Sequence, residues 1–177
     1  MTYKLTDIYR QIKEEEAALP KQQYKIYCDM DGVLCDFDRQ FEQYAKMSPK
    51  AFESKFRTDK FWELIDKIGY IFWSKMPWMS DGKTLWAYIS KYKPNLLSAP
   101  SKKASSRYGK RLWVNENIPG TKLILADRER KQNYSKKNSI LIDDRPDTIN
   151  EWNAKGGIGI LHTSATNTIE KLKELGL

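Results

Sequence analysis

Histidine and cysteine are scarce in this sequence, and their scarcity narrows the possible chemistry. Among 177 residues there is one histidine, His162, and there are two cysteines, Cys28 and Cys35. A Ser-His-Asp triad or a multi-histidine metal site would have to be built around His162 alone, which ends an apolar run and is predicted to be structural. The cysteines flank one short acidic segment, so we predict reduced thiols rather than a disulfide framework or a zinc site. Carboxylates are therefore the better candidates for chemistry.

Long apolar runs are also missing. No stretch approaches the 18 or more apolar residues that a bilayer-spanning helix needs, and the first twenty residues are too charged for a secretory signal. We therefore expect a soluble, cytoplasmic protein without a membrane partner. The length fits one domain with a small insertion, and the oligomeric state stays open.

Positive charge is concentrated in one part of the chain. The range 101–137 holds eleven of the 31 lysines and arginines and only three acidic residues, a surplus equal to the whole net charge of +8. Such a block attracts anions by raising their local concentration. A lysine-rich, solvated helix face is an equally simple interpretation.

Short apolar runs alternate with helical patterns along most of the chain. Strands are predicted at 24–28, 94–97, 122–125, 139–142 and 157–161, and helices at 101–117, 146–155 and 167–175. This alternation predicts an α/β fold with a parallel sheet and helices on both faces. Ligands of such sheets bind beyond the carboxyl ends of the strands.

Two segments depart from the alternation. Residues 3–17 have the spacing of an amphipathic helix, and we expect residues 1–20 to pack on the core. Residues 38–92 are rich in aromatic side chains and too long for a simple crossover, so they are predicted to form a small helical cap inserted after the first strand. The Rossmann-like core would then comprise residues 21–37 and 93–177. Most of the cap aromatics are expected to be core, although a few could stack on a flat substrate group.

Two carboxylates follow the first predicted strand. Asp29 and Asp31 are separated by one residue, so in extended chain their side chains can face the same way. A hard cation, which we predict to be Mg²⁺, would offset their repulsion and neutralise a bound phosphate. Asp29 can attack phosphorus to give an aspartyl phosphate, while Asp31 protonates the leaving group and later activates water. A calcium loop is the alternative, but it needs Gly at its sixth position and Glu at its twelfth, and here Gly is fourth and Gln40 is twelfth.

Further polar residues follow the other predicted strands. Ser98 can donate a hydrogen bond to phosphate, and Lys110, or alternatively Lys131, can steady both the Asp29 carboxylate and the phosphate. Asp143 and Asp144 follow the fourth strand and could complete a metal site. Each has a structural alternative, since Asp143 or Asp144 could cap the helix that begins near Pro146, and Ser98 could be a helix cap. Their joint occurrence at strand ends favours the functional interpretation.

These motifs resemble those of the haloacid-dehalogenase-like (HAD) phosphatase superfamily. The segment 29–34 matches its first motif, Ser98 the second, Lys110 the third, and Asp143 with Asp144 the fourth. More narrowly, the chain is similar to the 5'(3')-deoxyribonucleotidase family, whose DMDGVLADF appears here as DMDGVLCDF and whose LLIDDRPD corresponds to 140–147. The resemblance spans residue 24 to the last predicted helix.

The resemblance implies a Rossmann-like core with a cap and a magnesium cofactor. The metal would be bound by the Asp29 side chain, the Asp31 backbone carbonyl, and Asp143 or Asp144. Phe37 and cap aromatics such as Trp73 would hold the base of a nucleoside monophosphate. Two departures from the family pattern bear on the phosphate site. Ala99 lacks a hydroxyl that the family aims at the phosphate. The family's arginine-aspartate-lysine after the third strand is altered in 127–131, and we choose Lys131 as the counterpart of its lysine.

The resemblance favours hydrolysis of a nucleoside or deoxynucleoside monophosphate. Three alternative functions stay open. The substrate could be another small phosphomonoester, or a terminal phosphate on a nucleic-acid strand held by the basic block. From a different class, the chain could be a non-catalytic nucleic-acid binding module with a vestigial acidic motif. Binding alone does not require a nucleophilic aspartate, so the complete motif set argues against the module.

Overall fold

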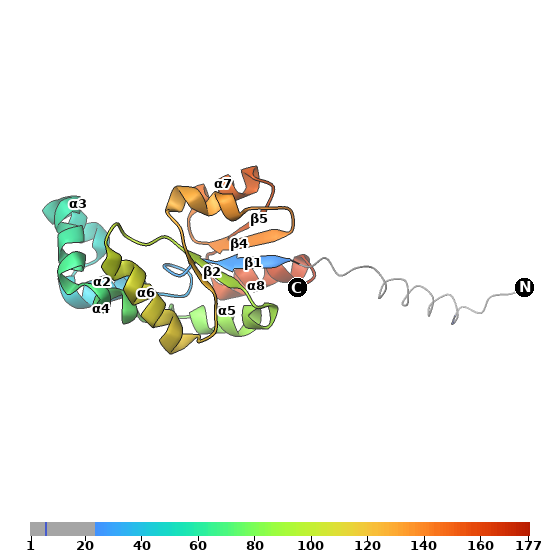
Figure 1. The fold of residues 1–177 in the computed structure, drawn as a ribbon, viewed down its shortest axis with the longest axis horizontal. Coiled ribbons are helices and arrows are strands. Elements are labelled where there is room, and N and C mark those ends of the chain that lie inside the picture. Colours follow the sequence, from blue (N-terminus) through green and yellow to red (C-terminus); the bar gives the residue numbers. More distant parts are fainter. Residues whose placement is uncertain (1–5, 7–23) are drawn as a thin grey trace, which may run out of the picture.

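The computed structural model of the chain describes residue 6 and residues 24–177 (Figure 1). The helix predicted for residues 3–17 therefore lies, apart from residue 6, outside the described residues. Within them, the five predicted strands form one sheet: β1 (Lys25–Cys28), β2 (Asn95–Ser98), β3 (Leu123–Leu125), β4 (Ser139–Asp143) and β5 (Ile158–Leu161). All neighbouring strands are parallel, in the order β3-β2-β1-β4-β5. The α/β fold class is thereby confirmed.

Helices cover both faces of this sheet. Successive side chains of each strand point to opposite sides, and the strands carry apolar side chains on both sides that the helices bury. On one face, Tyr27, Leu97 and Leu141 pack with Ile149 and Trp152 of α7 (Pro146–Ala154). On the other face lie α5 (Gly82–Ile89), α6 (Ala104–Asn117) and α8 (Ala165–Glu174). Figure 1 shows α7 above the sheet and α5 and α8 below it.

The segment after β1 is helical and aromatic. It contains α2 (Phe37–Ala45), α3 (Pro49–Ile68), which is broken at Arg57, and α4 (Tyr70–Ser74). Phe41 stacks on Phe61 with ring centroids 4.5 Å apart, and neighbouring rings extend this cluster. The packing agrees with the expectation that most of these aromatics are core. The boundaries 38–92 for a cap stay a prediction, and α5, inside that range, contacts the C-terminal part: Ala165 donates a hydrogen bond to Asp81 and Tyr88 donates one to the Leu177 carbonyl.

Close contact between α4 and α6 depends on Gly109. A Cβ atom at this position would lie 2.5 Å from the Tyr70 carbonyl oxygen and 2.6 Å from Trp73 Cβ. Only glycine lets the two helices approach so closely. This contact fixes the position of the next residue, Lys110.

Candidate active site

The register of β1 and β4 brings three aspartates together. Cys28 pairs with Ile142, so the residues that follow them, Asp29 and Asp143, emerge side by side at the carboxyl edge. The Asp29 amide also donates a hydrogen bond of 2.9 Å to the Ile142 carbonyl. One oxygen each of Asp29, Asp143 and Asp144 lie within 4.8 Å of one another. The sequence predicted that these aspartates meet, and the backbone pairing of β1 with β4 brings them together.

Gly32 allows Asp144 to complete the group. Its φ angle is +76°, a value that L side chains rarely adopt, and a Cβ atom there would lie 2.4 Å from Asp144 Oδ2. The turn after Asp31 therefore runs directly against the Asp144 carboxylate. A side chain at position 32 would displace this carboxylate from its neighbours.

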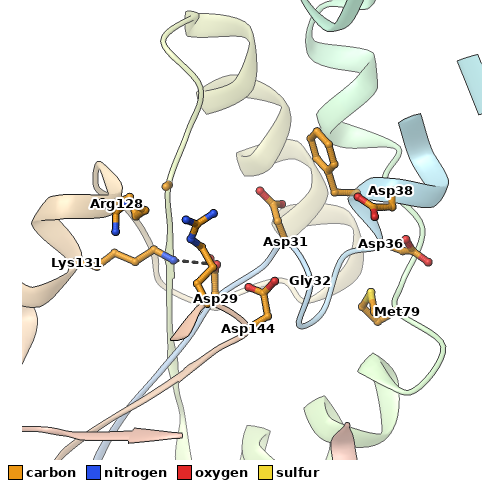
Figure 2. Close-up of a pocket in the computed structure, with 12 residues that line it drawn as sticks. Asp29, Asp31, Gly32, Asp36, Asp38, Met79, Arg128, Lys131 and Asp144 are labelled. Atoms are coloured by element: carbon orange, nitrogen blue, oxygen red, sulfur yellow. Dashed lines mark ion pairs between the residues drawn. The ribbon is translucent and has the colours of Figure 1, made fainter. Parts of the chain in front are cut away.

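The lysine beside Asp29 is Lys131, the second of the two candidates. Lys131 Nζ lies 2.8 Å from Asp29 Oδ2, an ion pair that Figure 2 marks with a dashed line. The same Nζ lies 2.7 Å from Asp143 Oδ2, and all three side chains are buried. It belongs to η2 (Arg128–Tyr134), the 3₁₀ segment after β3. Burial alone would lower the pKa of Lys131, but the carboxylates of Asp29 and Asp143 outweigh burial and raise it. Lys131 is therefore a permanent positive charge between two strand ends.

Lys110 contacts Asp31 rather than Asp29. Its Nζ lies 2.7 Å from both Asp31 carboxylate oxygens and donates a 3.0 Å hydrogen bond to Ser98 Oγ. Lys110 and Ser98 are fully buried, so Ser98 reaches the site through this lysine. The Asp31 pKa is raised by burial, and Lys110 opposes that rise.

A cavity of about 400 Å³ opens beside the aspartates. Among the predicted substrate residues, Phe37, Ala99 and Lys131 line it, whereas Ser98 and Trp73 do not. Ser98 is fully buried and accepts a hydrogen bond from Lys110. Trp73 is only 2% exposed, and its ring lies over Lys110 Nζ at 5.2 Å, because α4 is held against α6. The predicted contact between Trp73 and substrate is therefore corrected to a packing contact.

Five lining residues were not named as site residues from the sequence: Asp36, Asp38, Met79, Arg128 and Arg145. Figure 2 shows Arg128 and Lys131 on one side of the cavity and Asp36 and Asp38 on the other. Arg145 directly follows the two predicted aspartates, which was a usable signal. Met79 carries no such signal, since it reaches the cavity through a long-range hydrogen bond from its amide to the Leu34 carbonyl.

The grouped carboxylates repel one another. Burial, followed by the charge of Asp29, raises the pKa of Asp143 to about 6. Burial, Asp29 and Asp143 raise the pKa of Asp144 to about 7. Lys131 supplies one positive charge for three carboxylates, so the group carries an uncompensated negative charge when all three are ionised.

These residues fit a divalent cation. Asp29 Oδ1 is buried and has no hydrogen-bond partner among the described residues. Such an atom is costly to bury unless something else satisfies it. Carboxylate oxygens are the ligands that Mg²⁺ and Ca²⁺ prefer. Asp144 is exposed to the cavity, whereas both Asp143 oxygens accept hydrogen bonds, from Lys131 Nζ and from the Arg145 amide.

The structural alternatives have mixed outcomes. The residue before α7 is Arg145, and no side chain caps this helix, although Asp143 does accept the Arg145 amide hydrogen bond at 3.0 Å. His162 is buried, with Nδ1 2.8 Å from Thr168 Oγ1, and it does not line the cavity. Cys28 and Cys35 are free and buried, as predicted.

Comparison with known proteins bears on the fold. No family model matches the chain, and no curated protein matches it. Among solved structures, the chain is similar to a hydrolase from Streptococcus pneumoniae TIGR4, with 16% identity, a TM-score of 0.51, and coverage of 85% of this chain and 99% of that one. A HAD-superfamily hydrolase from Ehrlichia chaffeensis aligns at 10% identity and a TM-score of 0.49, covering 86% of this chain and 97% of that one. The similarity to the Streptococcus pneumoniae hydrolase shows that the chain shares its fold with a known hydrolase.

No helix in the described part of the chain combines the length and the apolar character that a membrane span requires.

Proposed function

We propose that the protein is a magnesium-dependent phosphomonoesterase of the HAD type, with Asp29 as nucleophile. The observation that carries the proposal is the buried Asp29 Oδ1, which has no hydrogen-bond partner in the described part of the chain and lies in a group with Asp143 and Asp144 at the carboxyl edge of a parallel sheet. A bound Mg²⁺ would supply charge neutralisation for the phosphate and the carboxylates. Asp29 and Asp144 would hold it, and Asp143 would support them through Lys131.

The chain's own residues can carry both steps of hydrolysis. Asp29 forms a bond to phosphorus as the ester P–O bond breaks, and Asp31 gives its proton to the departing alkoxide. Asp31, now ionised, accepts a proton from water as the water oxygen attacks the aspartyl phosphate. Inorganic phosphate leaves and Asp29 is restored. The raised Asp31 pKa favours its role as an acid, and Lys110 holds its carboxylate in place.

Lys131 has two consequences for this chemistry. It holds the Asp29 carboxylate in place through a 2.8 Å ion pair, and it adds positive charge next to the transferred group. Arg128 and Arg145 line the same cavity and are held by Asp147, at 3.0 Å from each guanidinium. The cationic side of the cavity is thus suited to a phosphate group.

A nucleoside or deoxynucleoside monophosphate is the proposed substrate, as the 5'(3')-deoxyribonucleotidase resemblance implies. The cavity volume of about 400 Å³ is within the usual range for small-ligand sites. Phe37 offers a flat ring at its edge, and this ring is fixed by contacts with Phe61, Phe72 and Trp73. Asp36 and Asp38 can accept hydrogen bonds from sugar or base donors.

The test is turnover of a phosphomonoester panel with Mg²⁺ and with EDTA, combined with acid quenching of a labelled substrate. We expect release of phosphate only with the metal, and label attached to protein that disappears in Asp29→Asn. Cleavage of sugar phosphates with no turnover of nucleoside monophosphates would refute the substrate. Full activity of Asp29→Asn would refute the mechanism.

A further inference from the structure

Exposed apolar side chains, most of them aromatic, lie on α3, α4 and α6. Of the six large hydrophobic residues exposed in the described chain, five belong to α3, α4 and α6. Phe56 lies before the break in α3, and the other four are Trp62 at 40%, Tyr70 at 46%, Ile71 at 45% and Tyr108 at 55%. The Tyr70 and Tyr108 rings touch edge to face, with centroids 5.4 Å apart. Grouped exposed apolar side chains mark interaction sites more often than scattered ones do.

Positive charge lies beside these rings. Lys102 and Lys103 are exposed in the loop before α6, and Arg111 is exposed one turn after Tyr108 on the same helix. Lys102 and Arg111 form no ion pair with any described residue, and Lys103 has only a marginal one, 4.0 Å from Asp66. The basic block seen in the sequence thus contributes three cations to this surface. We call these three cations and the four exposed apolar residues the aromatic–basic surface.

A cleft of about 420 Å³ joins the two kinds of side chain. Trp62 and Asp66 line it from α3, and Pro100, Ser101, Lys102 and Lys103 line it from the loop. The preceding residue, Ala99, lines the catalytic cavity. The two hollows therefore flank successive residues of one short loop, so a ligand longer than a mononucleotide could occupy both.

We propose that the aromatic–basic surface binds single-stranded nucleic acid, with a strand end directed toward the catalytic cavity. Flat rings beside exposed cations are the combination that proteins use for single strands, because every base can stack and every nucleotide carries a phosphate. A terminal phosphate on that strand would be the hydrolysed group, and this second part rests on the proposed function. The binding itself does not depend on catalysis.

The test is fluorescence anisotropy with a labelled oligothymidylate and the matching RNA, each of about ten nucleotides, in EDTA. Trp62→Ala should weaken binding by about fivefold or more, as the loss of one stacked base predicts, and Trp62→Phe should restore most of the affinity. The double variant Lys102→Gln/Lys103→Gln should reduce the slope of log K against log salt by about 1.4.

The matched control is Lys136→Gln/Lys137→Gln. It removes two exposed lysines of the same basic block, but near the start of β4, at the opposite edge of the sheet. We expect no change in affinity. Absence of saturable binding at low salt, an equal loss in the control, or equally tight binding to anionic lipid vesicles would each overturn the inference.

Measurements of turnover distinguish a failure of this inference from a failure of the proposed function. With Mg²⁺, Trp62→Ala should raise KM for a terminally phosphorylated strand more than KM for the mononucleotide. Hydrolysis of mononucleotides without strand binding would refute the inference alone. Strand binding without hydrolysis of any phosphomonoester would refute the proposed function alone.

Discussion

Lys131 Nζ lies 2.8 Å from Asp29 Oδ2, and both side chains are buried. The same ammonium group lies 2.7 Å from Asp143, so one lysine serves two carboxylates that belong to neighbouring strands. A buried charge that loses its partner is strongly destabilising. This pair therefore couples the chemistry of the site to the stability of the sheet.

Replacing Lys131 by Gln should abolish turnover and lower the free energy of unfolding by about 3–5 kcal/mol without metal, because two carboxylates lose their partner. Mg²⁺ should recover part of that loss by supplying positive charge. Urea unfolding with and without the metal measures both effects. Lys136→Gln, which removes an exposed lysine, is the control and should change stability by less than about 0.5 kcal/mol. A loss no larger than that of the control would contradict the pairing.

Replacing Lys110 by Met should move the pH dependence of kcat/KM. Lys110 opposes the burial that raises the Asp31 pKa, so without Lys110 this pKa rises further. If Asp31 must be protonated to donate to the leaving group, activity is lost above its pKa, and the alkaline limb should shift to higher pH in the variant. A pH–rate profile measures the shift. Asp31→Asn should remove most activity at every pH, and an unmoved limb in Lys110→Met would exclude Asp31 as the titrating acid.

Asp144→Asn should stabilise the metal-free protein at pH 8 more than at pH 5. The folded-state pKa of Asp144, about 7, is raised above the ordinary carboxyl value, so its contribution to stability is present below pH 4 and is lost as the pH rises through 7. Asp144 is exposed to the cavity and partly screened, so the prediction concerns the direction of the change.

The same variant tests metal binding. In the original protein, stabilisation by Mg²⁺ should grow from pH 5 to pH 8, because the ligands must be ionised. In Asp144→Asn this stabilisation should be largely lost. Thermal unfolding at both pH values, with Mg²⁺ or EDTA, provides the measurement. Equal stabilisation of both proteins by Mg²⁺ at pH 8 would exclude Asp144 as a ligand.

Gly109→Ala should destabilise the protein by about 1–3 kcal/mol, since the added methyl group meets the Tyr70 backbone and Trp73 Cβ, neither of which can move independently. The displaced contact should also reduce kcat, because Lys110 is the next residue. Urea unfolding and steady-state kinetics test the two effects. Ser105→Ala, on the same helix, serves as the control, and a Gly109→Ala protein of unchanged stability would contradict the close approach.

Much of the fold could be predicted from the sequence because its signals are local. Each of the five strands is a short apolar run. β1 begins one residue later than predicted, and β4 ends one residue later than predicted. In a parallel sheet the carboxyl ends meet at one edge, so Asp29 and Asp143 could be expected near each other. The strand pairing then gives the actual contact.

The partners of the two lysines could not be predicted, because they depend on how α6 and η2 pack on the sheet. Nothing in the spacing of Lys110 says that it reaches Asp31 and Ser98 rather than Asp29. Trp73 was likewise ambiguous, since an aromatic residue in an inserted helical segment can face either the cavity or the interior. The close packing at Gly109 decides this, and it involves residues more than 30 positions apart.

The aspartates of the site and the other residues that line the cavity come from different parts of the fold, and this separation has an evolutionary consequence. Asp29 and Asp143 are positioned by the central strand β1 and its neighbour β4, whereas Phe37 and Met79 reach the cavity from segments outside the sheet. Exchange of side chains at these peripheral positions would alter which molecule fits the cavity and leave Asp29 and Asp143 in place. The contact between α4 and α6 would have to be kept, because it fixes Lys110 beside Asp31. A scaffold arranged in this way can acquire new specificities through the segments that line the cavity from outside the sheet.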